Sequence, residues 1–277
     1  MRYLTTICAL ACLVGTAAAG TKPEDVVAKN LDSIGAPDAR AAVKSRSVQG
    51  TLRFKSVVGG RIDATGAWQE VSEQHKSNFL MKFDAINWRG ERFVTDGDKT
   101  SIASATAGYH RSTLAEFVNS YSFIVSDGLL GGELSTNWAL QDLDRHKCKL
   151  ENIGVKKVDG RELQGLEYLS KNNNEMKVRL YFDPETGRHV MTVYEVAQGA
   201  IIAHTDKETA RQKDVRYILE ERFSDFQTEG GMTLPRAYDL RFSQELQNGS
   251  TSLYDWSMTA EKLVNNISLD PKNFELK

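Results

Sequence analysis

The chain has 277 residues, of which 40% are hydrophobic and 26% charged, and its formal net charge at pH 7 is −2. No stretch is strongly basic, which argues against a nucleic-acid-binding surface and against a polybasic membrane anchor. A chain of this length can bury one substantial core.

The first residues have the pattern of a secretory signal peptide. Arg2 precedes an apolar run from Leu4 to Val14, and small residues at Ala17 and Ala19 predict cleavage directly after residue 19. The apolar run is too short for a permanent membrane span. We therefore expect a signal peptide at residues 1–19, export to the periplasm, and a single domain over residues 20–277. A buried N-terminal helix is the alternative interpretation of the same run.

The positions of the cysteines bear on whether the mature chain has a disulfide or a lipid anchor. Cys8 and Cys12 lie in the predicted leader, so Cys148 alone remains in the mature chain and no internal disulfide is expected. A lipid anchor on Cys12 is a second alternative for the leader. Ala9 stands three residues before it, where an acylation motif prefers leucine, so the sequence disfavours this anchor.

The mature chain opens with helical signals and continues with serial hairpins. Residues 21–34 are expected to form a helix, followed by a short helical turn at 37–43. Strands begin at residue 47, and tight-turn dipeptides then recur at 59–60, 96–97, 159–160, 230–231 and 248–249. The clearest hairpin spans residues 176–195, where apolar and polar residues alternate on both sides of the turn from Asp183 to Gly187. Residues 197–214 interrupt the pattern and are expected to leave the sheet, with a short helix as one interpretation.

Helical spacing replaces the strand pattern once, in the middle of the chain. Thr113 and Glu116 fit a capping box, with Thr113 as the N-cap. The apolar residues that follow have the spacing of one helix face: Leu114, Phe117, Val118, Tyr121, Ile124 and Val125. Asp127 and Gly128 are expected to end the helix. Because this helix lies between two blocks of strands, we expect it to act as a lid across an open mouth of the sheet.

The predicted fold is mainly β (α+β): a curled antiparallel sheet, or unclosed β-barrel, covered by a few helices. With about eight strands or more, such a sheet can enclose a small ligand. The side chains expected to line a hydrophobic cavity are Phe54, Trp68, Phe79, Met81, Phe83, Val178, Leu180, Phe182, Met191 and Val193. The alternative is that these side chains pack against one another as an ordinary core.

The order of these features resembles that of the periplasmic lipoprotein-sorting proteins, the LolA/LolB-like superfamily. The resemblance rests on the leader, the helix ending at Gly35, the strand at 48–54, the helical interruption, the turns at 159–163 and 181–187, the stretches 225–226 and 231–235, and the late residues 266–267 and 274. It implies an unclosed barrel whose cavity takes acyl chains of lipids or lipoproteins. It also implies an arginine on an early strand that holds the lid, for which Arg53 and Arg61 are the candidates.

The sequence contains no catalytic motif. No histidine pair has metal-ligand spacing, no nucleophile turn is present, and residues 128–132 lack the Lys-Ser/Thr of a phosphate loop. His146 and Cys148 are interpreted as part of a surface strand with a free thiol, and Asp142, Asp144 and Glu151 as exposed strand charges. We therefore expect no catalysis, metal or cofactor, and a carrier or sensor that binds acyl chains of lipids or lipoproteins. The alternatives are an envelope assembly factor that binds a protein partner through the sheet edge or outer face, and an enzyme whose site forms only in the folded chain.

Overall fold

The computed structural model describes residues 21–57, 62–84, 89–106, 108–173, 175–198 and 214–276. The predicted signal peptide, Cys12, Arg61 and most of the 197–214 segment lie outside these ranges. Within them, no helix has the length and apolar character needed to cross a membrane.

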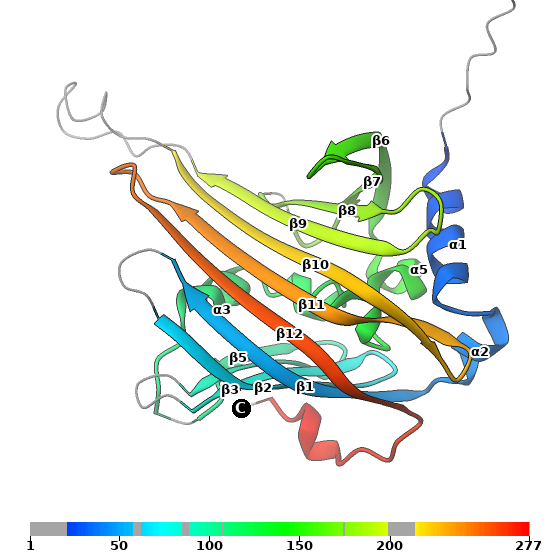
Figure 1. Ribbon diagram of the computed structural model, residues 1–277, viewed down its shortest axis with the longest axis horizontal. Coiled ribbons are helices and arrows are strands. Elements are labelled where there is room, and N and C mark those ends of the chain that lie inside the picture. The colour runs from blue at the N-terminus through cyan, green and yellow to red at the C-terminus, as the bar shows by residue number, and fades with distance from the viewer. Residues whose placement is uncertain are drawn as a thin grey trace, which may run out of the picture.

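The described residues form one antiparallel sheet of twelve strands (Figure 1). The strands are β1 (Ser45–Ser56), β2 (Ile62–Glu73), β3 (Lys76–Phe83), β4 (Gly90–Thr95), β5 (Thr100–Ser104), β6 (Lys149–Val158), β7 (Arg161–Leu169), β8 (Lys177–Phe182), β9 (His189–Gln198), β10 (Val215–Glu229), β11 (Met232–Glu245) and β12 (Thr251–Asn265). Their order is β5-β4-β3-β2-β1-β12-β11-β10-β9-β8-β7-β6. The sheet is curled and not closed, because β5 and β6 stand at its two ends, and this confirms the predicted fold class.

The helical elements are short and lie at the N-terminus, in the middle of the chain and near the C-terminus. They are α1 (Pro23–Ile34), α2 (Pro37–Ala42), α3 (Thr113–Ser120), α4 (Phe123–Ser126), α5 (Leu143–His146) and the 3-10 turns η1 (Gly132–Leu134), η2 (Ala139–Gln141) and η3 (Pro271–Phe274). In the view of Figure 1, α3 and α5 lie behind the central strands, on the concave side of the curled sheet. The middle group thus occupies the face on which a lid was predicted.

Local turn chemistry produces the predicted hairpin between β8 and β9. The Asp183 carboxylate accepts hydrogen bonds from the backbone N–H groups of Glu185 and Thr186, at 3.1 and 2.8 Å. Gly187 has φ 76°, a left-handed conformation in which a glycine avoids the steric cost of a Cβ. The turn residues identified in the sequence therefore reverse the chain as expected.

A bulge next to this turn changes which face the returning strand presents. The register shifts so that Phe182 pairs with His189 while Tyr181 pairs with Met191. One extra residue inverts the alternation of side chains between the two faces. Met191 consequently joins Leu163 and Tyr181 in a small convex cluster, with Val193 packed against it. The expectation that Met191 and Val193 share a face with Leu180 and Phe182 is wrong.

Candidate functional site

The concave face of the sheet is apolar and carries the remaining predicted cavity residues. Phe54, Trp68, Phe79, Met81, Phe83, Val178, Leu180 and Phe182 are each at most 5% exposed and belong to one continuous core cluster. Their rings are in contact: the centroids of Phe54 and Phe83 lie 6.0 Å apart, and Phe79 stacks on Phe93 at the same distance. The structure therefore brings these eight residues together on one surface.

Residues 112–146, here called the cover segment, lie on this surface. Leu114, Phe117 and Val118 of α3 are buried in the same cluster, and Tyr121 is packed against it. The ring centroid of Phe117 lies 5.1 Å from that of Phe242 on β11. The predicted lid helix therefore does lie across the concave face.

The cover segment continues well beyond its first helix. Trp138 is 1% exposed and stacks on His189 of β9 with 4.8 Å between ring centroids. A Cβ added to Gly132 would approach the Phe223 ring to 2.9 Å, which shows how closely this part of the segment packs on the sheet. The sequence predicted a partly hollow interior, whereas in this structure the chain fills the space with its own cover segment.

The first helix of the cover segment is capped one residue earlier than predicted. Ser112, rather than Thr113, is the N-cap, and its hydroxyl accepts a hydrogen bond from the Ala115 N–H at 3.2 Å. Glu116 pairs with Arg111 at 3.5 Å. Both Ser112 and Thr113 can cap in principle, so the sequence alone left the boundary uncertain by one residue.

This boundary can be tested with two alanine substitutions. Ser112→Ala removes the capping oxygen and should lower the free energy of unfolding by about 1 kcal/mol. Thr113→Ala at the neighbouring exposed position should leave it nearly unchanged. Urea denaturation of both variants measures the difference, and an equal loss in the two would contradict the assigned cap.

An arginine on β1 holds the middle of the cover segment. The Arg46 guanidinium is buried and donates from Nη1 to the backbone carbonyls of Glu133, at 2.7 Å, and Leu134, at 3.4 Å. Its Nε donates to Asn265 Oδ1 at 2.8 Å. Among the described residues, Arg46 is thus an early-strand arginine that contacts the cover. Arg53, one of the two candidates from the sequence, is exposed and pairs instead with Asp63 at 2.6 Å.

A buried carboxylate on β10 holds the cover segment from the other half of the sheet. Glu221 Oε1 accepts a hydrogen bond from the Gly131 N–H at 2.8 Å and another from the Tyr238 hydroxyl at 2.5 Å. Glu221 Oε2 accepts from the Tyr194 hydroxyl at 2.5 Å. One side chain of the sheet thus joins two neighbouring strands to the backbone of the cover.

Three more polar side chains of the concave face contact the cover in the same way. Glu91 Oε1 accepts from the Ser112 N–H at 2.8 Å, and Ser72 Oγ accepts from the Thr136 N–H at 2.9 Å. The Glu70 carboxyl is hydrogen-bonded by Ser135. We refer to the five sheet residues with this role as the latch residues: Arg46, Glu70, Ser72, Glu91 and Glu221.

Burial shifts the ionisation of three latch residues toward their neutral forms. Desolvation raises the pKa of Glu70 to about 8 and that of Glu221 to about 7, in both cases against hydrogen bonds that act in the opposite direction. Desolvation lowers the pKa of Arg46 to about 10, so its guanidinium remains charged at neutral pH. The latch therefore combines a charged guanidinium with two carboxyl groups, Glu70 and Glu221, that burial makes easier to protonate.

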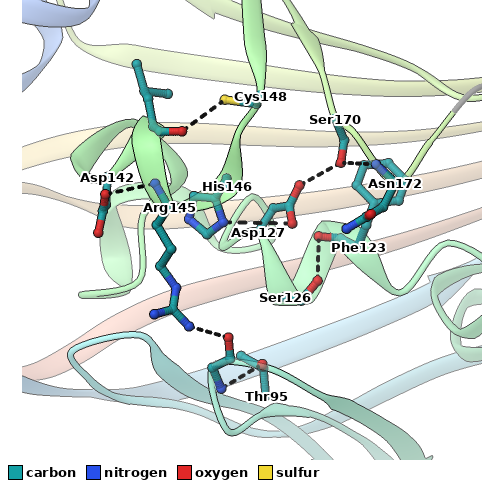
Figure 2. A network of polar contacts seen from close by, with 12 residues as sticks. Thr95, Phe123, Ser126, Asp127, Asp142, Arg145, His146, Cys148, Ser170 and Asn172 are labelled. Carbon is teal, nitrogen blue, oxygen red and sulfur yellow. Dashed lines mark hydrogen bonds and ion pairs between the residues drawn. The ribbon is translucent and has the colours of Figure 1, made fainter.

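A second polar cluster ties the cover segment to β7 (Figure 2). Asp127 Oδ2 accepts from the Tyr168 hydroxyl at 3.1 Å and from the Ser170 hydroxyl at 2.8 Å. His146, at the end of α5, lies with its Nδ1 3.8 Å from Asp127 Oδ1, and its side chain is only 5% exposed. The predicted surface strand at His146 is therefore wrong, because this residue ends the helix α5 and its side chain lies against Asp127.

The chemistry of this cluster favours a structural role. Burial raises the pKa of the half-buried Cys148 thiol, which keeps it protonated, whereas a nucleophilic cysteine needs a lowered pKa. Burial likewise lowers the pKa of His146 and raises that of Asp127. Asp142, which was expected on a strand, instead caps α5 by accepting from the Arg145 N–H at 3.2 Å. Across the described ranges, no group of three or more His, Cys, Asp or Glu side chains is placed to hold a metal ion.

Sequence reasoning found the apolar half of this site and missed its polar half. The latch residues share the strand register of the cavity residues, but the sequence interpretation selected only the apolar members of that register. A charged residue in an otherwise apolar register, such as Glu221 between Leu219 and Phe223, is the signal that could have identified them.

No protein-family model and no curated protein sequence matches the chain. Three similar solved structures are a LolA superfamily protein from Nitrosomonas europaea, an outer membrane lipoprotein-sorting protein domain from Vibrio parahaemolyticus and a DUF1329 family protein from Desulfovibrio piger. Their sequence identities to this chain are 14%, 11% and 12%, and their TM-scores are 0.48, 0.43 and 0.41. The matches cover 92%, 90% and 92% of this chain and 98%, 97% and 98% of the respective structures.

Proposed function

We propose that this protein is an exported, periplasmic carrier or sensor that binds acyl chains of lipids or lipoproteins without catalysis. In this proposal the acyl chain lies on the concave face in place of the cover segment. The observation that carries the proposal is the latch: an apolar sheet surface is closed by an irregular segment, and that segment is held at its backbone by buried polar side chains.

The burial energy of an acyl chain can be compared with the hydrogen bonds of the latch. Burying one methylene group contributes about 0.8 kcal/mol, so a chain with about twelve buried methylene groups gains about 10 kcal/mol before ordering costs. A hydrogen bond to a charged group contributes about 1.5–3 kcal/mol, and a neutral one about 1 kcal/mol. The acyl chain also replaces the apolar contacts of the cover with contacts of the same kind. The gain from burying the chain is therefore comparable with the cost of breaking the hydrogen bonds of the latch.

The cavity residues supply a test that leaves the fold intact. Val178→Thr places a hydroxyl of the same shape on the concave face, where Val178 is fully buried. We expect it to weaken binding of the fluorescent fatty acid 11-(dansylamino)undecanoic acid about threefold to tenfold, because the unpaired hydroxyl must be desolvated against the chain. Fluorescence titration of the purified mature protein measures the affinity.

Val193→Thr is the matched control, because Val193 packs on the convex face. It should leave the affinity for the dansyl acid unchanged. A wild-type protein that does not bind the dansyl acid would refute the proposal, and equal effects of the two substitutions would place the site elsewhere.

A second candidate function is binding of a protein partner by the outer face. The observation in its favour is the convex cluster of Leu163, Tyr181 and Met191, which adjoins the strand β6 at one end of the sheet, where Val155 is 54% exposed. Lys156 and Lys157 on the same strand disfavour edge-to-edge pairing of β6 with further copies of the chain. Loss of partner binding by Val155→Lys with unchanged dansyl-acid binding would support this function.

A further inference from the structure

A depression of about 330 Å³ lies where the cover segment meets the N-terminal helices and the turn between β2 and β3. Its wall includes Arg40 of α2, Lys44 just after α2, His75 in the turn, Asn137 of the cover segment, and Asp142 and His146 at α5. This volume is within the range of small-molecule sites. The depression is separate from the concave face, and neither the latch nor the predicted cavity accounts for it.

Buried polar atoms at this depression lack partners. Asn137 is 2% exposed, and within the described chain neither its amide oxygen nor its amide nitrogen makes a hydrogen bond. Arg40 Nη1 is also buried without a hydrogen bond among the described residues, and the carboxylate nearest to it, that of Asp32, is 4.0 Å away. Unsatisfied buried donors and acceptors are costly, and a bound molecule that supplies the missing hydrogen bonds would remove that cost.

The charges of the wall define which molecule fits. Arg40 and Lys44 are cations, and Asp142 is the carboxylate that lines the depression, 3.8 Å from His75. Arginine and lysine donors favour a phosphate group. A carboxylate repels a bare anion but accepts hydrogen bonds from hydroxyls, and the Asn137 amide can both donate to a hydroxyl and accept from it. The complementary ligand has a phosphate at one end and hydroxyls at the other.

We propose that this depression binds a phosphorylated polyol of the glycerol phosphate class, with Arg40 and Lys44 on the phosphate and Asn137 and Asp142 on the hydroxyls. The same chemistry occurs in the headgroup of a phospholipid and in free glycerol phosphate. If the ligand is a phospholipid headgroup, the inference rests on the proposed acyl-chain function. If it is free glycerol phosphate, the inference does not depend on that function. Because Asn137 belongs to the cover segment and Arg40 to α2, the ligand would bridge the cover to the N-terminal helices.

The test is isothermal titration calorimetry of the full mature protein with sn-glycerol 3-phosphate, inorganic phosphate and glycerol. We expect glycerol 3-phosphate to bind at least tenfold more tightly than either of the other two. The double variant Arg40→Gln/Lys44→Gln and the single variant Asn137→Ala should each weaken this binding at least tenfold. Thermal denaturation verifies that the variants are folded.

The control is a second depression of about 330 Å³ on the sheet, whose wall contains Lys82 and Lys262. Lys82→Gln/Lys262→Gln removes the same amount of charge and should leave the affinity unchanged. No binding of glycerol 3-phosphate to the wild type, equal affinity for inorganic phosphate, or equal weakening by the two double variants would each overturn the proposal.

Two further titrations distinguish a phospholipid headgroup from free glycerol phosphate, and this inference from the proposed acyl-chain function. Dihexanoyl phosphatidylglycerol below its micellar concentration should bind more tightly than glycerol 3-phosphate if the ligand is a lipid headgroup, and no more tightly if it is the free compound. The Arg40→Gln/Lys44→Gln variant should still bind 11-(dansylamino)undecanoic acid. Wild-type binding of the dansyl acid without binding of glycerol 3-phosphate would therefore overturn this inference alone.

Discussion

Replacing Arg46 by methionine is expected to lower the free energy of unfolding by about 3–5 kcal/mol, the usual cost of removing one partner from a buried ionic network. The substitution keeps the length and volume of the stem but removes the donors to the carbonyls of Glu133 and Leu134. Those carbonyls then stay buried without a partner, or the cover segment separates from the sheet. Urea denaturation followed by tryptophan fluorescence measures the loss.

The matched control is Arg53→Met on the same strand. The Arg53 side chain faces solvent on the convex side and forms an exposed ion pair with Asp63. Exposed pairs add little to stability because water and salt screen them. No measurable loss is expected for this variant, and a loss as large as that of Arg46→Met would show that Arg46 has no special role.

Glu221→Gln is expected to remove a pH dependence from the stability of the protein. Burial raises the folded-state pKa of Glu221 to about 7 from the ordinary value of 4.5, so the folded chain holds a proton between these values that the unfolded chain releases. The contribution of Glu221 to stability is therefore complete below pH 4.5 and is lost as the pH rises to 7. At about 1.4 kcal/mol for each pH unit, the loss amounts to about 3 kcal/mol.

Comparison with the glutamine variant isolates this group from others that titrate. The buried His189, whose pKa burial lowers to about 3, acts in the opposite direction between pH 3 and 6.5 in both proteins and cancels in the difference. Tyr194 and Tyr238, which donate to Glu221, stay protonated throughout because burial raises the pKa of both. Stability of the wild type relative to Glu221→Gln should fall from pH 4.5 to 7 and stay constant above; a difference that rises with pH would contradict the assignment.

Local signals in the sequence were sufficient to predict most of the fold. The turn from Asp183 to Gly187 reverses the chain through hydrogen bonds among neighbouring residues, which is why it could be recognised without the structure. The face of Met191 could not be predicted, because a bulge in the strand pairing inverts the alternation and leaves no mark in the composition. The N-cap at Ser112 was misplaced by one residue, since two adjacent hydroxyl residues fit the same motif.

The site was less predictable because its polar half depends on contacts between distant parts of the chain. Arg46 donates to carbonyls 87 and 88 positions away, and a backbone carbonyl carries no residue-specific signal that a sequence can show. Glu221 likewise binds the backbone N–H of Gly131. The extent to which residues 112–146 fill the concave face depends on packing in three dimensions. Amphipathic spacing predicted a single helix from Leu114 to Val125, which the structure divides into α3 and α4, and it predicted no cover beyond that helix.

The central claim is that an acyl chain and the cover segment occupy the concave face in turn. Hydrogen–deuterium exchange of the mature protein, with and without saturating 11-(dansylamino)undecanoic acid, tests it most directly. The account predicts that the ligand speeds exchange of the amides at 129–138, including the Gly131 N–H that Glu221 now holds, while amides of β1, β8 and β11 keep or gain protection. Unchanged or slower exchange at 129–138 with the ligand bound would contradict it.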